Sequence, residues 1–240
     1  MIEKNVLHIF ENSHTPMKDV ALELGLSSSM VSLGHTTFYR IMKDVMVDDN
    51  HFSHYLRVIR SCSVKFHYHF IELTSLIAAQ LAFDMDTHHR KANVDQIVFA
   101  AMFCDSTLRK SEWIHIRSSE QLKGLSGTII KEINMHALKA SEMTLHFRLA
   151  PEGAWRIIRH HHGDLNGLGF GKKVDENFCF LTKCLMTAQE IAHAILMNPG
   201  LPARTLVADT VQKLSETELG EFAIRFEGHC RAHYGKVASC

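Results

Sequence analysis

The chain has 240 residues, and its 26 lysines and arginines are matched by 26 aspartates and glutamates. This length suits one domain with a sizeable core, or one domain with a small extension. An apolar content of 46% excludes a disordered or low-complexity chain. The zero net charge argues against a protein that coats nucleic acid or an anionic membrane.

Membrane insertion and export are also not expected. The longest apolar run spans residues 97–104, far short of the ~20 residues that a membrane helix needs. The N-terminus leads into no hydrophobic signal core, and the six cysteines show no CxxC spacing. We therefore expect reduced thiols in a cytoplasmic protein.

The apolar pattern predicts an all-α protein. Residues 1–55 form a less periodic N-terminal extension, with polar breaks at 27–29 and 48–50. Stripes of apolar residues at helical spacing then predict five helices, which include residues 66–81, 94–101, 129–147, 155–158 and 178–195. After Pro199 and Pro202, further helices are expected around 204–214 and 216–230. Clear strand alternation is absent, and only four prolines and thirteen glycines interrupt the chain.

Three of these stripes lead to ionisable residues. Counting four residues on from Ala101 reaches Asp105, His136 lies between apolar positions of its stripe, and four residues on from Ile158 is His162, beside His161. Burial of such groups alone costs several kcal/mol, so each needs a partner. Backbone carbonyls can satisfy single histidines, and Asp105 can cap a turn. One divalent metal ion would satisfy all four together.

The densest glycine stretch, residues 163–171, follows directly after this histidine pair. Gly163 is placed to end a helix in the left-handed conformation, and the later glycines let the backbone approach a ligand closely. Such a loop is either an ordinary connector or one wall of a ligand site.

The groups follow in a recognisable order: an Asp-ended dipeptide, a histidine thirty residues on, a His-His pair and a glycine loop with an aromatic residue. This order resembles the HD-GYP domain, a branch of the HD phosphohydrolases, over about residues 60–210. Residues 103–108 stand at the family's HD-x-G-K segment and His136 at its His-Pro. Residues 161–163 stand at its HHE, and 166–171 at its DGxGYP.

The resemblance implies an HD-domain-like helical bundle over residues 56–240, with residues 1–55 as a short helical extension. It also implies hydrolysis of cyclic di-GMP at a centre of two or three metal ions. Asp105, His136, His161 and His162 would form one complete metal pocket. For this chain we expect iron or manganese, with one or two ions bound.

The second metal pocket would use the remaining ligands that the resemblance implies. These are His67 (or His69, two residues on), Asp105 as a bridge, Glu190 and Cys104. Cysteine is a softer ligand than imidazole, and a buried cysteine is also a common core residue. One metal pocket is therefore complete in the sequence, and the other is altered.

Four positions depart from the family pattern. The histidine of the HD dipeptide is Cys104, the lysine is Leu108, the glutamate of HHE is Gly163, and the Tyr-Pro pair is Phe170-Gly171. The lost lysine helps to hold the phosphate in the family. The resemblance therefore implies a weak or altered activity.

Substitutes for the lost groups are present nearby. Arg109 or Lys110 would hold the phosphate in place of the lysine, and Gly167, Gly169 and Phe170 would shape the nucleotide site. Phe170 keeps a stacking face for guanine and lacks the tyrosine hydroxyl.

Three functions remain open from the sequence. The first is a metal-dependent phosphodiesterase with cyclic di-GMP or a related nucleotide as its partner. The second is a catalytically inactive nucleotide-binding or signalling module, with a homodimer or a signalling protein as partner. The third is DNA binding by residues 20–40, which resemble a helix-turn-helix core. The recognition helix of that motif, 28–39, has no lysine or arginine before Arg40, so nucleic acid is not the expected partner.

Overall fold

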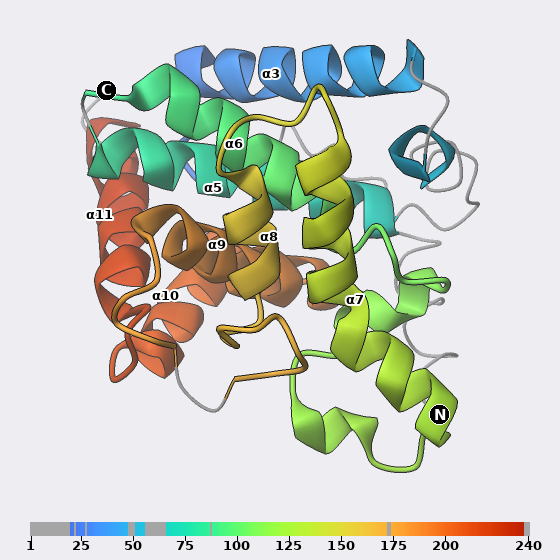
Figure 1. Ribbon diagram of the computed structural model, residues 1–240. Coiled ribbons are helices and arrows are strands. Elements are labelled where there is room, and N and C mark those ends of the chain that lie inside the picture. Colours follow the sequence, from blue (N-terminus) through green and yellow to red (C-terminus); the bar gives the residue numbers. More distant parts are fainter. Residues whose placement is uncertain are drawn as a thin grey trace.

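A computed structural model describes residues 20–21, 23–26, 28–47, 51–55, 66–86, 88–171 and 174–237. Within these ranges all regular elements are helices, which confirms the prediction of an all-α protein (Figure 1). The α-helices and the two 3-10 helices η1 and η2 are, in chain order, α3 (Ser28–Val47), α5 (Phe66–Met85), α6 (Arg90–Phe103), η1 (Ser111–His115), η2 (Ser119–Leu122), α7 (Gly127–His146), α8 (Ala154–His160), α9 (Phe180–Met197), α10 (Ala203–Leu214) and α11 (Gly220–Val237).

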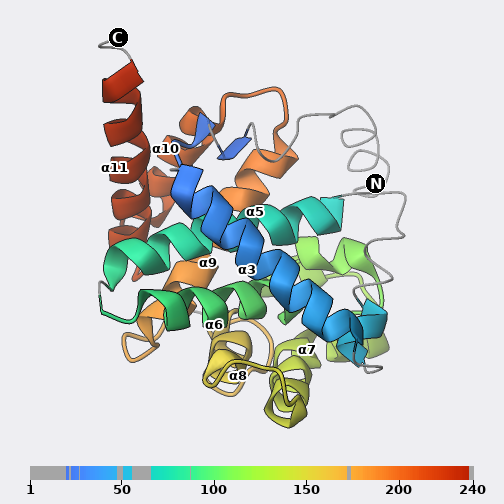
Figure 2. The same cartoon turned by 90° about the horizontal axis from the view of Figure 1, so that it is seen from above.

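Helix α5 lies at the centre of the bundle. It is buried around its whole circumference between Phe70 and Ala82, as expected of a helix that is apolar on all sides. It packs against α3, α6 and α9. Helix α3 crosses over α5 and α6, which is clearest in the view from above (Figure 2). Helix α7, which contains His136, and helix α8, which ends just before His161, pack against each other on the far side of α6 from α3 (Figures 1 and 2).

The five sequence stripes correspond to helices α5 to α9, with Phe147 just after the end of α7 and Phe178 just before the start of α9. Of the two C-terminal helices, α10 lies close to the expected range, whereas α11 begins at Gly220 rather than at 216 and continues to Val237. A Cβ at position 220 would lie 2.7 Å from the carbonyl oxygen of Ser215. The tight turn before α11 therefore needs a glycine.

The described part of the N-terminal extension shares the core of the other helices. Phe38 and Val45 of α3 are buried, and the Phe52 ring lies 4.6 Å from that of Phe103 between centroids. In the sequence proposed as a DNA-recognition helix, Tyr39 is exposed and Phe38 faces the core. Among the described residues, none of the helices combines the length and the apolar character that crossing a membrane requires.

Candidate metal centre

The four inward-facing groups come from three separate parts of the chain. Asp105 lies in the turn after α6, His136 lies in the middle of α7, and His161 and His162 follow the end of α8. Only His136 is thus inside a helix. The others keep a helical register because the first residue after each helix, Cys104 and His161, still has right-handed helical angles.

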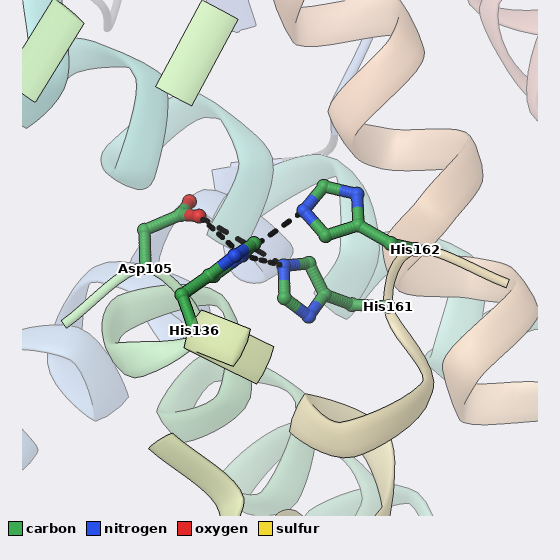
Figure 3. A group of neighbouring side chains, drawn as sticks. All are labelled: Asp105, His136, His161 and His162. Atoms are coloured by element: carbon green, nitrogen blue, oxygen red, sulfur yellow. Dashed lines mark hydrogen bonds and ion pairs between the residues drawn. The ribbon is translucent and has the colours of Figure 1, made fainter. Parts of the chain in front are cut away.

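These four side chains converge on one point (Figure 3). One ligand atom from each of them lies within 4.8 Å of all the others. The Nε2 atom of His136 is central: it lies 3.2 Å from Nε2 of His161 and 3.1 Å from Nε2 of His162. Asp105 Oδ1 lies 3.4 Å from His136 Nε2 and 3.8 Å from His161 Nε2. The expected meeting of these residues is therefore present in the structure.

The backbone fixes which ring nitrogens face the centre. Nδ1 of His136 faces the carbonyl oxygen of Ile133, and Nδ1 of His161 lies 2.6 Å from the carbonyl oxygen of Ile158. A carbonyl only accepts hydrogen bonds, so both Nδ1 atoms carry the proton. In the neutral rings each Nε2 then directs a lone pair to the centre, beside the carboxylate. Metal-binding histidines are oriented in this way.

Burial and the neighbouring groups shift the pKa values of Asp105, His161 and His162. Burial alone would raise the pKa of Asp105, but hydrogen bonds and charge from His136 and His161 outweigh it and hold that pKa well below its usual value. Burial also lowers the pKa of His161 and, more strongly, of His162. Burial therefore favours the neutral ring at His161 and His162 beside the Asp105 carboxylate, and a carboxylate with neutral imidazoles is the combination that binds a divalent cation.

Two of the other expected ligands, His67 and Cys104, lie outside this group. His67 Nε2 is 2.9 Å from the hydroxyl of Tyr55, and burial lowers the His67 pKa to about 4. The Cys104 sulfur lies 3.6 Å from Asp105 Oδ2, and burial, followed by the charge of Asp105, raises the thiol pKa. A protonated thiol is a poor metal ligand.

Glu190 has a different partner from the one that the sequence suggested. Its Oε1 atom accepts hydrogen bonds from Nη2 of Arg117 at 2.7 Å and from Nε at 3.2 Å. The preceding residue, Gln189, is fully buried, and its Nε2 lies 3.5 Å from the Cys104 sulfur. At this turn of α9 the neutral amide of Gln189 therefore points inward, and the carboxylate of Glu190 lies on the adjacent side of the helix.

The two cations expected to hold a phosphate lie at the surface. Arg109 pairs with Glu132 of α7 at 3.0 Å, and Lys110 lies 3.6 Å from Glu112. Both side chains are more than half exposed. Arg109 and Lys110 are thus each paired with a carboxylate. The neighbouring Leu108 packs against the core.

The glycine loop is bonded to α7 on both sides of His136. The Gly169 N–H donates to the Asn134 carbonyl at 2.7 Å, and the Leu138 N–H donates to the Gly167 carbonyl at 3.2 Å. Both glycines have positive φ, and a Cβ at position 167 would lie 3.0 Å from a backbone oxygen of α8. Packing on the helices therefore explains these glycines without a ligand.

Phe170, the aromatic residue of this loop, reaches the metal centre. Its ring lies 4.6 Å from that of His162 between centroids, in an edge-to-face arrangement. The contact places an aromatic side chain beside the ligand group, and it holds the orientation of the His162 ring.

Three residues near the centre were missed from the sequence: Tyr55, Arg117 and Gln189. Gln189 had a usable signal, because it lies four residues after Leu185 and thus on the edge of an apolar stripe. Tyr55 and Arg117 had none, since their segments show no helical periodicity and their partners lie 12 and 73 residues away.

No protein-family model, curated protein or solved structure matches the chain. The HD-GYP assignment thus stays an expectation from the sequence motifs.

Proposed function

We propose that Asp105, His136, His161 and His162 bind a divalent metal ion, and that the protein is a metal-dependent phosphodiesterase with weak or altered activity on a cyclic dinucleotide such as cyclic di-GMP. The observation that carries the metal site is the fixed orientation of the rings. Two Nδ1 protons bond to backbone carbonyls, so Nε2 lone pairs and one carboxylate meet within 4.8 Å.

The donor set fits the ion that the sequence suggested. Imidazole suits iron and zinc, and a carboxylate adds the oxygen ligand that manganese prefers. When bound, such an ion polarises a phosphoryl oxygen and lowers the pKa of water. The residues of the chain supply the rest: Asp105 provides the single negative charge, and buried His161 keeps its ring neutral and oriented by Ile158.

A second candidate is a catalytically inactive nucleotide-binding or signalling module. It is favoured by the surroundings of Cys104, where the neutral amide of Gln189 and a protonated thiol stand in place of charged ligands. Glu190, the carboxylate expected there, is bonded to Arg117. Two-metal hydrolases clamp the attacking and leaving oxygens with both ions, so the loss of one metal position lowers turnover.

The test combines metal analysis with a hydrolysis assay. Full-length protein purified without chelator should contain metal, and His136→Gln should lose it. His88→Gln is the matched control, since His88 is exposed and outside the centre. Metal-dependent hydrolysis of cyclic di-GMP supports the phosphodiesterase, whereas metal and nucleotide binding without turnover supports the inactive module. Absence of metal after supplementation with manganese, iron and zinc would refute the metal site and the phosphodiesterase, and would leave the inactive module as the better interpretation.

A further inference from the structure

A second polar group lies next to the metal centre and plays no part in it. This group, the Arg117 cluster, consists of Arg117, Glu190, His115 and His193. Arg117 follows η1, and Glu190 and His193 lie three residues apart on α9. The rings of His115 and His193 have their centroids 5.6 Å apart. The Arg117 side chain is 14% exposed and that of Glu190 is 39% exposed, so the cluster is buried on one side and open to solvent on the other.

The cluster contains more hydrogen-bond donors than acceptors. A guanidinium has five N–H groups, and the two hydrogen bonds that the Arg117 side chain makes to described residues both end on the same oxygen, Oε1 of Glu190. Nδ1 of His115 and Nε2 of His193 are buried without a hydrogen-bond partner among the described residues. Buried polar atoms in native proteins normally have a partner, which can be water, an ion or a ligand.

The chemical groups of the Arg117 cluster favour an anion as its ligand. Arg117 carries a fixed positive charge, and each neutral imidazole can donate one N–H. A guanidinium with convergent N–H donors matches the oxygens of a phosphate. A second metal centre of the same kind is not indicated, because among the described residues the ligand atoms gathered within 4.8 Å are those of Asp105 and its three histidines.

The cluster lies beside the metal centre because α9 links the two. Gln189 faces Cys104, which contacts Asp105, and the next residue, Glu190, binds Arg117. The charge of Arg117 also contributes to the lowered pKa of His162, after burial and the neighbouring histidines. An anion bound to Arg117 would therefore lie within the electrostatic field of the metal centre.

We propose that Arg117, His115 and His193 form a phosphate-binding site next to the metal centre, and that Glu190 holds the guanidinium in place until a phosphate competes for it. Arg117 then supplies the positive charge that Leu108 cannot supply. The phosphate site stands on its own geometry; only its assignment to the phosphate of a nucleotide substrate rests on the proposed function.

Isothermal titration of inorganic phosphate into the full-length protein tests the site directly. The protein is used as purified and after dialysis against a chelator, so that phosphate on the metal is separated from phosphate on Arg117. We expect saturable binding in both states. Arg117→Gln should weaken it about 10-fold or more, as expected for loss of a charge-assisted contact. Glu190→Gln should tighten it, because the competing carboxylate is removed.

Two controls make the result specific. Arg231→Gln removes an exposed arginine that is also paired with a glutamate at 2.7 Å, Glu227, and it should leave phosphate binding unchanged. Asp105→Asn should impair the metal centre, and the dialysed variant should still bind phosphate saturably. If Arg117→Gln does not fold, Arg117→Lys replaces it, with a smaller loss because lysine lacks the planar fork.

The possible outcomes separate this proposal from the proposed function. No saturable phosphate binding by the dialysed wild type, or equal binding by the Arg117 variant, overturns the phosphate site. A protein that binds phosphate through Arg117 and hydrolyses no cyclic di-GMP keeps the phosphate site and loses the phosphodiesterase. Histidine NMR gives a second readout, since phosphate should shift the ring signals of His115 and His193.

Discussion

Metal binding should raise the thermal stability of this protein, and Asp105→Asn should reduce the increase. A ligand that binds only the folded state at 100 times its Kd adds about 2.7 kcal/mol to the free energy of unfolding. For a chain of this size each kcal/mol raises Tm by roughly 2–4 °C, so the expected shift is about 5–11 °C. The four ligand atoms already lie within 4.8 Å of one another, so little rearrangement opposes metal binding.

Asp105 is the only charged ligand of the four, and its Oδ1 faces both His136 and His161. Asparagine keeps the shape and removes the charge. If metal affinity falls tenfold, about 1.4 kcal/mol of the stabilisation is lost at fixed metal concentration, which is roughly 3–6 °C of the shift.

The assay is a thermal melt of chelated protein with and without added manganese, iron or zinc. Asp209→Asn is the control, since Asp209 is exposed on α10, and it should retain the full shift. The reasoning is refuted if no metal raises Tm, or if Asp105→Asn keeps the same increase as the wild type.

Three further predictions follow from the residues around the centre. Glu190→Gln should leave metal content unchanged in elemental analysis, because the recorded partner of Glu190 is Arg117; a loss of metal would make Glu190 a ligand. The pKa of His67 is lowered by burial from 6.5 to about 4, so on acidification the unfolded chain takes up this proton first. Urea unfolding should therefore show a stability loss of up to about 3 kcal/mol between pH 6.5 and 4, and a His67→Gln variant with the same slope would contradict it. The double change Cys104→His with Leu108→Lys should raise cyclic di-GMP turnover about 10²–10³-fold with manganese or iron supplied; metal binding without turnover would point to a binding role.

The helices and the meeting of the four groups of the candidate metal site could largely be predicted from the sequence. Helical periodicity is a local property, and it was clear enough to locate α5 to α9 and to show Asp105, His136 and His162 in register with apolar positions. The same register did not decide whether the Glu190 side chain points toward the candidate metal site or away from it. That residue lies beside an apolar stripe, and a difference of one position rotates a side chain by about 100° around a helix.

What the sequence could not determine depends on contacts between distant segments. Arg117 meets Glu190 across 73 residues, and the Tyr55 hydroxyl meets His67 from a segment with no periodic pattern. The role of the glycine loop also depends on contacts that the sequence did not reveal. Its hydrogen bonds to Asn134 and Leu138 of α7 give its glycines a structural role. Composition and periodicity determined which faces are buried. Packing of helices from separate parts of the chain decided which buried or half-buried polar groups meet, because each such group must find its partner in three dimensions.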